Sequence, residues 1–143
     1  MNGYKIEEVA RLCGLTKRTI RYYEEIGLLF PPERSAGGFR LYDDRHIERL
    51  KRIVGARDAL GFSLQELQEF IGISDEFDSQ REAARSVRRA EEKLERIADI
   101  ERTIARQMKM IDQKLGKLQE YRKQLEQLSD RVQEAKTKYK TQE

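Results

Sequence analysis

The second half of the chain carries a narrow apolar stripe that a long helix would line up. From position 94 onward, apolar side chains recur at alternating steps of three and four residues, with Glu101 at one expected apolar site. That spacing is typical of a coiled-coil seam. The seam comprises Leu94, Ile97, Ile104, Met108, Ile111, Leu115 and Leu118. After a phase slip near Tyr121 and Arg122, it resumes with Leu125, Leu128, Val132, Ala135 and Tyr139.

One helix over residues 81–139 would be on the order of 88 Å long. An isolated helix cannot cover such a stripe, so a partner helix is needed, either from a second chain or from the same chain folding back. Gly116 costs roughly 1 kcal/mol relative to alanine inside a helix, which permits a break but does not require one. Two interpretations therefore stay open: one continuous helix, or two helices with a bend near Gly116.

The composition changes near residue 72. Residues 1–72 hold eight of the nine glycines, both prolines and eight of the eleven aromatic residues. The remainder is rich in Glu, Lys, Arg and Gln and can bury only a narrow stripe. We therefore expect a compact head over 1–72, a polar hinge over 73–80, a helical tail over 81–139 and a frayed terminus over 140–143.

Net charge gives little information about binding partners. The head has 12 basic and 11 acidic residues, and the rest of the chain has 17 and 15. No apolar run approaches 18 residues and no secretory leader is present, so we expect a soluble cytoplasmic protein with no membrane partner.

The inventory of reactive side chains is small. One cysteine, Cys13, cannot form an internal disulfide or a thiolate cluster, and we expect it to be a small core residue. One histidine, His46, cannot supply a histidine-rich metal site, and we expect it at the surface. No paired-carboxylate or glycine-rich phosphate motif is present, so the sequence predicts no enzyme activity, cofactor or metal site.

Two short helices are predicted near the N-terminus. Ile6, Val9 and Leu12 follow helical spacing in the first, and Gly14 ends it. Thr16 is a candidate N-cap for the second helix, and the tight turn between the two has helix-turn-helix spacing.

The second helix has an inward and an outward side. Ile20 and Tyr23 point inward, and the 3.6-residue period then directs Lys17, Arg18, Arg21 and Tyr22 outward. A cationic helix face suits insertion into the major groove of DNA, where arginine pairs with guanine edges. The other interpretation is an ordinary solvated helix face, and this stretch alone does not separate the two.

The segment after this helix predicts a hairpin wing followed by two more helices. Gly37 and Gly38 form the turn, and alternation places Arg40 and Tyr42 on one face, opposite Phe39 and Leu41. We expect the face of Phe39 and Leu41 to pack on the core and the other face to offer a cation and a phenol to a phosphate. Asp43 or Asp44 caps a third helix, and Ser63 with Glu66 forms a capping box for a fourth.

The head contains an ordered set of motifs: Y4-x-I6-x-E8-V9-A10, L15-T16-x3-I20-R21-Y22-Y23-E24-x2-G27-L28, P32-x-R34-x3-G38-F39-R40-x-Y42, I47-x2-L50 and G61-F62-S63-L64. Together these motifs resemble the MerR family of bacterial transcription regulators. The match covers the whole head and extends more loosely into the tail. The resemblance implies an all-α fold with a small β-hairpin wing, in which a winged helix-turn-helix domain precedes a long coiled-coil dimerisation helix.

The resemblance also implies function. Such a protein would bind double-stranded DNA as a homodimer, at a pseudo-palindromic promoter operator. On binding an effector it would distort the DNA and so act on RNA polymerase indirectly, at the bacterial nucleoid in the cytoplasm. Arg18 and Arg21 would contact bases. The phosphate contacts would be Lys17, Tyr22, Tyr23, Arg40 and Tyr42.

Two positions depart from the metal- and redox-sensing branches of the family. An alignment on the run A90-E91-E92-K93-L94 places Gly116 and Ala83 where those branches have thiolate ligands, so thiolate sensing is not expected. Any small-molecule effector is unknown and its pocket has no assigned residues. An alternative hypothesis is a structural DNA-anchoring or chromosome-organising protein, with the same head and a bridging coiled coil.

Overall fold

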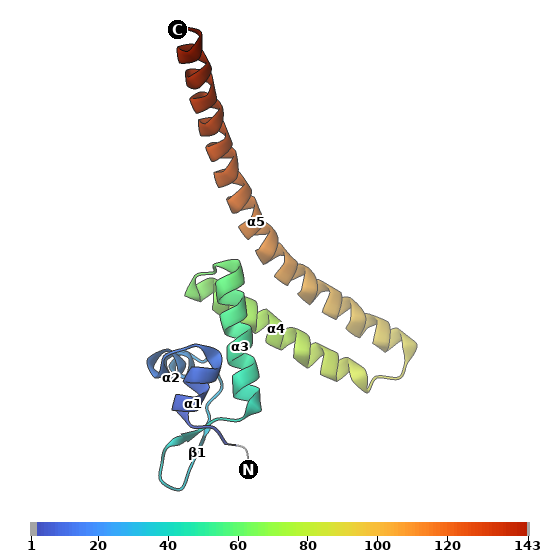
Figure 1. Ribbon diagram of the computed structural model, residues 1–143. Helices are drawn as coiled ribbons and strands as arrows, with labels where there is room; N and C mark the ends of the chain where they lie inside the picture. Colours follow the sequence, from blue (N-terminus) through green and yellow to red (C-terminus); the bar gives the residue numbers. More distant parts are fainter. Residues whose placement is uncertain (1–2, 143) are drawn as a thin grey trace. The chain divides into compact units, whose positions relative to one another are not determined.

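The computed structural model describes residues 3–142, which contain five helices and one two-stranded hairpin (Figure 1). In chain order they are α1 (Ile6–Cys13), α2 (Lys17–Glu25), β1 (Glu33–Arg34), β2 (Arg40–Leu41), α3 (Asp44–Leu60), α4 (Leu64–Arg85) and α5 (Ala90–Thr141). The chain divides into two compact units between Ser79 and Gln80. From here on, the head is this first unit, which ends at Ser79 and so extends beyond the head predicted over 1–72.

Helices α1 and α2 form the predicted helix-turn-helix. Gly14 ends α1 in the left-handed region, with φ 66°, and its N–H donates to the carbonyl of Ala10. Two residues later the side chain of Thr16 accepts the N–H of Thr19 at 3.1 Å, which caps α2. A glycine that tolerates positive φ and a threonine that satisfies a free N–H therefore define the turn from both sides.

The wing is the antiparallel pair β1 and β2, in which Glu33 lies opposite Leu41 and Arg34 opposite Arg40. Tyr4 and Tyr42 exchange two backbone hydrogen bonds of 2.7 and 2.9 Å. The returning strand of the wing is therefore held by the segment that precedes α1.

The prediction that Phe39 packs on the core while Tyr42 is available to a phosphate is wrong. Tyr42 is fully buried and Arg40 is half-buried, whereas Phe39 is 48% exposed. Arg40 and Tyr42 thus point toward the head, and Phe39 lies at the surface with the ammonium of Lys5 5.1 Å from its ring centroid.

Helix α3 begins with a capping box. Asp43 accepts the N–H of Arg45 at 2.9 Å, and its own N–H donates to Nδ1 of His46 at 3.1 Å. The prediction that His46 lies at the surface is wrong, because the imidazole is only 2% exposed and packs against the rings of Phe30 and Tyr42. Contacts with these two rings, which lie outside α3 and leave no signal in its helical period, bury the side chain.

One apolar core holds the head together. Cys13 is buried, and burial raises the pKa of its thiol. The largest fully buried side chains are Val9, Ile20, Leu29, Tyr42, Leu50, Ile53, Leu67 and Ile71, from every helix of the head and the wing. Burial of this many large side chains gives the head a core of its own.

Helix α4 starts at the predicted capping box, since Ser63 N–H donates to Glu66 at 2.9 Å and Glu66 N–H donates to Ser63 Oγ at 3.2 Å. It then continues through 73–80, so the prediction of a hinge there is wrong. The acids of this polar stretch pair with arginines of α3: Asp75 with Arg49, and Asp78 with Arg52.

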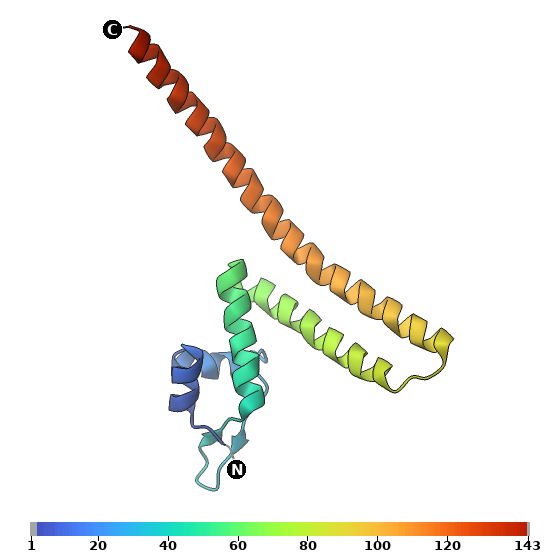
Figure 2. The same ribbon diagram turned by 45° about the vertical axis from the view of Figure 1, so that its right-hand side comes forward.

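The interruption lies later, between Arg85 and Ala90, where the chain reverses direction (Figure 2). Lys93 Nζ donates to the carbonyl of Ala84 at 2.6 Å, and Thr103 Oγ1 donates to Gln80 Oε1 at 2.7 Å, so the start of α5 lies against the end of α4. The predicted helix over 81–139 is therefore divided: 81–85 belong to α4, and α5 starts at Ala90.

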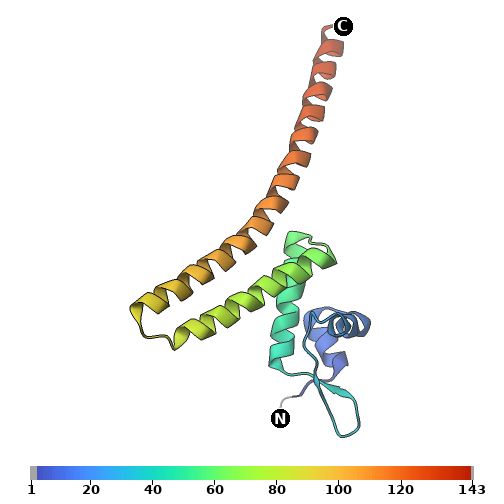
Figure 3. The same cartoon turned by 180° about the vertical axis from the view of Figure 1, so that it is seen from behind.

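Helix α5 is continuous over 52 residues and passes through Gly116 without a break (Figure 3). This resolves the two interpretations of the tail in favour of one helix. No helix within residues 3–142 is both long and apolar enough to cross a membrane.

Candidate DNA-binding surface

The outward face of α2 is cationic and open to solvent. Lys17, Arg18, Arg21 and Tyr22 are all exposed, whereas Ile20 is fully buried. Nζ of Lys17 lies 3.6 Å from a carboxylate oxygen of Glu7, in an exposed ion pair that water screens. The helix thus presents two arginines, a tyrosine and a lightly held lysine on one side.

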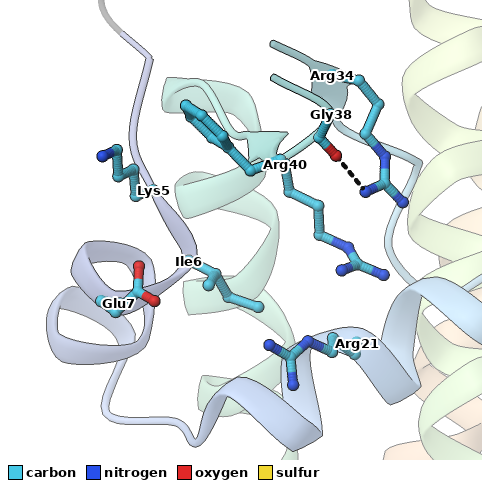
Figure 4. Close-up of a pocket in the computed structure, with 8 residues that line it drawn as sticks. Lys5, Ile6, Glu7, Arg21, Arg34, Gly38 and Arg40 are labelled. Atoms are coloured by element: carbon cyan, nitrogen blue, oxygen red, sulfur yellow. Dashed lines mark hydrogen bonds between the residues drawn. The ribbon is translucent and has the colours of Figure 1, made fainter. Parts of the chain in front are cut away.

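A pocket of about 580 Å³ lies between α2, the start of α1 and the wing (Figure 4). Four cationic side chains line it, together with one acid and three uncharged residues: Lys5, Ile6, Glu7, Arg21, Arg34, Gly38, Phe39 and Arg40. Such an excess of positive charge in a concave surface attracts a polyanion.

Two residues of this pocket, Lys5 and Arg34, were not predicted from the sequence. Arg34 donates from Nη1 to the carbonyl of Gly38 at 3.1 Å, which ties the wing together across its turn and leaves the guanidinium at the pocket (Figure 4). Its pairing opposite Arg40 would have indicated it, since directly paired residues of a hairpin point to the same face. Lys5 immediately precedes α1 and carries no comparable signal.

Arg40 is held by a carboxylate of α2. Its Nε donates to Glu24 Oε1 at 3.1 Å, and the hydroxyl of Tyr42 donates to Glu24 Oε2 at 2.5 Å. The side chain of Glu24 is only 11% exposed, and that of Arg40 is 29% exposed. Burial, followed by the hydrogen bond to Glu24, raises the pKa of Tyr42, so this phenol is neutral and serves as a donor.

Two of the predicted phosphate contacts do not fit this geometry. Tyr42 is fully buried and its hydroxyl is used by Glu24, while Tyr23 is 5% exposed and packs in the core. The family resemblance implied that both lie near phosphates, but neither side chain reaches the surface. The inward position that helical period predicted for Tyr23 is correct. Tyr22, the other tyrosine of α2, is 44% exposed and keeps that prediction.

The predicted seam of α5 lies largely at the surface. Leu94 is 66% exposed, Met108 57% and Leu118 60%, and Ile97, Ile104 and Leu115 are also exposed, with Ile111 half-buried. Thr103 is the one buried residue of α5 within the described part of the chain, and it is not on the seam. The apolar stripe is therefore available to another helix.

Comparison with known proteins decides the family. The family model described as MerR HTH family regulatory protein matches residues 4–72. The chain is also 38% identical over 135 residues to the HTH-type transcriptional regulator YfmP of Bacillus subtilis (strain 168), a match that spans 94% of this chain and 96% of that protein. The chain belongs to the MerR family. It is a DNA-binding transcription regulator, as its motifs predicted, and the predicted fold class is confirmed.

Two further matches extend over most of the chain. The HTH-type transcriptional regulator CueR of Escherichia coli O157:H7 is 41% identical over 111 residues, 78% of each protein. The crystal structure of the transcription regulator PbrR691 from Ralstonia metallidurans CH34, in complex with lead(II), covers 87% of this chain and 84% of that one, with a TM-score of 0.50 and 23% identity, and shows the fold alone. Relatives of the MerR family named here are regulators, not enzymes, and they do not favour the alternative of a structural DNA protein.

Proposed function

We propose that this MerR-family regulator binds a pseudo-palindromic operator within a promoter as a homodimer and distorts the DNA to control transcription. The observation that carries the proposal is the cationic pocket between α2 and the wing, adjoining the exposed face of α2. A recognition helix in the major groove would place that pocket along the neighbouring phosphates.

The individual roles follow from exposure and chemistry. Arg18 and Arg21 project from the outward face of α2 and would reach bases, since a guanidinium pairs with two acceptors of guanine. The phosphate contacts would be Lys17, Tyr22 and Arg40, to which the pocket adds Lys5 and Arg34. Tyr23 and Tyr42 are left out because they are buried.

The dimer would form through α5. Its stripe of exposed apolar side chains, Leu94 to Leu118, would be covered by the same stripe of a second chain in an antiparallel coiled coil. A two-fold dimer carries two copies of α2, and two copies match the two half-sites of a palindrome.

Distortion of the DNA would be the regulatory output. The energy of deforming a promoter spacer depends on its sequence and can be altered by a bound protein, so the dimer would act on RNA polymerase through the DNA. A small-molecule effector, of unknown class, would set this balance. A protein that binds promoters is associated with the nucleoid, so we infer a cytoplasmic location.

Footprinting on promoter fragments, starting with that of its own gene, tests the proposal. We expect one protected palindrome. Many scattered sites, and no change in transcription when the gene is deleted, would instead indicate a structural DNA protein.

A pair of substitutions tests the division between base and phosphate contacts. Arg21→Ala should cost about 1–3 kcal/mol on the operator and relax base preference, whereas Lys17→Ala should weaken binding to all sequences and reduce the salt slope by about one. Titrations of operator and random DNA at several salt concentrations measure both. Equal losses on both DNAs for Arg21→Ala would contradict the assignment.

A further inference from the structure

The carboxylate of Glu24 lies between two donors of the wing. Oε1 accepts Nε of Arg40 at 3.1 Å, and Oε2 accepts the hydroxyl of Tyr42 at 2.5 Å. Glu24 belongs to α2, whereas Arg40 and Tyr42 belong to or adjoin β2, 16 and 18 residues further along the chain. The recognition helix and the wing are thus joined by a charged, largely buried contact.

We propose that Glu24 is a positioning residue that holds the guanidinium of Arg40 toward a DNA phosphate in the pocket between α2 and the wing. This inference rests on the proposed function. It assigns a role in DNA binding to an acidic residue, although an acid repels the phosphate backbone.

The geometry of Arg40 supports this role. The bond to Glu24 uses Nε, so the Nη atoms of the guanidinium stay available at the pocket that Arg40 lines (Figure 4). An arginine fork with free Nη atoms fits a phosphate. A free arginine side chain also loses rotamer entropy when it is immobilised. A side chain already held by Glu24 avoids much of that loss on binding.

Tyr42 contributes by holding Glu24. Its hydroxyl occupies the second carboxylate oxygen, so the carboxylate cannot rotate freely away from Arg40. Tyr42 is fully buried and packs edge-on against His46, with ring centroids 5.3 Å apart. Tyr42 thus connects Glu24, and through it Arg40, to the core of the head.

The two possible roles of Glu24 predict opposite effects on DNA affinity when its negative charge is removed. If Glu24 acts only as a negative charge near DNA, Glu24→Gln tightens binding. If Glu24 positions Arg40, Glu24→Gln weakens binding, because the neutral amide oxygen of glutamine holds the guanidinium of Arg40 less strongly than a carboxylate oxygen does.

The experiment measures the Kd for operator DNA, at several salt concentrations, for Glu24→Gln, Arg40→Ala and the double variant. We expect Glu24→Gln to raise Kd about five- to tenfold and to flatten the salt slope. In the Arg40→Ala background the same change should have no further weakening effect, since a double-mutant cycle isolates coupling between two residues.

The matched control is Glu25→Gln, which removes an exposed carboxylate from the next position of α2. It should leave Kd within about twofold of wild type or tighten binding slightly. Binding by Glu24→Gln as tight as wild type would overturn the inference, as would an equal weakening in the Arg40→Ala background. The proposed function fails only if the wild-type protein does not bind an operator. The variants test Glu24 alone, so failure of this inference can be told apart from failure of the proposed function.

A second measurement requires no substitution and guards against a variant that does not fold. Proton exchange at Nε of Arg40, followed by nuclear magnetic resonance in the free wild-type protein, should be at least about fivefold slower than at Nε of the exposed Arg18. Equal exchange rates would show that Glu24 does not hold Arg40, and would overturn the inference.

Discussion

The head and helix α5 bury their apolar residues in different ways. In the head, large side chains such as Ile20, Leu50 and Ile71 are fully buried within one chain. Along α5 the large apolar residues of the stripe stay 40–68% exposed, with Ile104 at the lower end and Val132 at the upper end, apart from the half-buried Ile111. The head completes its own core, whereas α5 has an apolar surface that needs another helix. The difference teaches that folding and assembly are separable in this protein.

The strongest test of that separation substitutes one leucine in each region. Leu50→Ala should destabilise the head by about 2–5 kcal/mol, independently of protein concentration, because it opens a cavity in a filled core. Leu118→Ala, at a 60% exposed position, should lower stability only to the extent that a dimer is lost, and so should depend on concentration. Denaturant titration at two protein concentrations measures both. Concentration-independent losses for both variants would refute the comparison.

The second prediction concerns Ile111, a half-buried residue of the seam. Ile111→Asp should dissociate the dimer, because it places a charge in a narrow apolar interface. Sedimentation gives the mass. Gln113→Asp, at an exposed position two residues away, is the control and should leave the dimer intact. An unchanged mass for Ile111→Asp would show that the seam does not join two chains.

The third prediction tests a stabilising contact inside the head. The bond from the side chain of Arg45 leads the interactions that lower the pKa of Asp43 to about 2, from 3.8. A lowered pKa means that ionised Asp43 stabilises the fold above pH 3.8, and that this stability is lost as pH falls toward 2. Asp43→Ala should cost about 1 kcal/mol at neutral pH and flatten that acid dependence.

Asp43→Ser is the matched variant for this test. A serine retains an acceptor for the first N–H groups of α3 but does not ionise, so it should recover most of the stability while keeping the flattened acid dependence. Unfolding followed from pH 5 to pH 2 would decide, and an unchanged acid dependence in both variants would rule out Asp43 as its source.

The smallest effect is expected at Gly116. A Cβ built there has no heavy atom within 4 Å in the single chain, and alanine favours a helix interior over glycine by about 1 kcal/mol. Gly116→Ala should therefore raise the thermal midpoint of α5 slightly, as measured by circular dichroism. A lower midpoint would indicate that a second chain approaches α5 closely at this point.

Features that depend on neighbours in the chain could be predicted from the sequence. Thr16, Asp43 and Ser63 each cap a helix through a partner two or three residues away, and all three were expected at helix starts. The outward face of α2 was also correct, because helical period alone assigns it. The family followed from ordered motifs across the head.

Features that depend on distant partners could not be predicted. Alternation along the wing separates Tyr42 from Phe39, but which of them is buried depends on the carboxylate of Glu24, which accepts the hydroxyl of Tyr42. We predicted a hinge over the polar segment 73–80. The segment is helical, because its acids pair with arginines of α3 that lie 26 residues earlier in the chain. His46 is buried for the same kind of reason, since Phe30 and Tyr42 pack against it.

Features set by residues close together in the chain were determined by the sequence alone. Cap residues, helical period and family motifs are of this kind. They gave the order of the helices, the cationic face of α2 and the membership of the MerR family. Which polar side chains are buried, and which acid holds Arg40, was settled by the packed head. Burying a polar group costs free energy unless a partner is present, and that partner is supplied by folding.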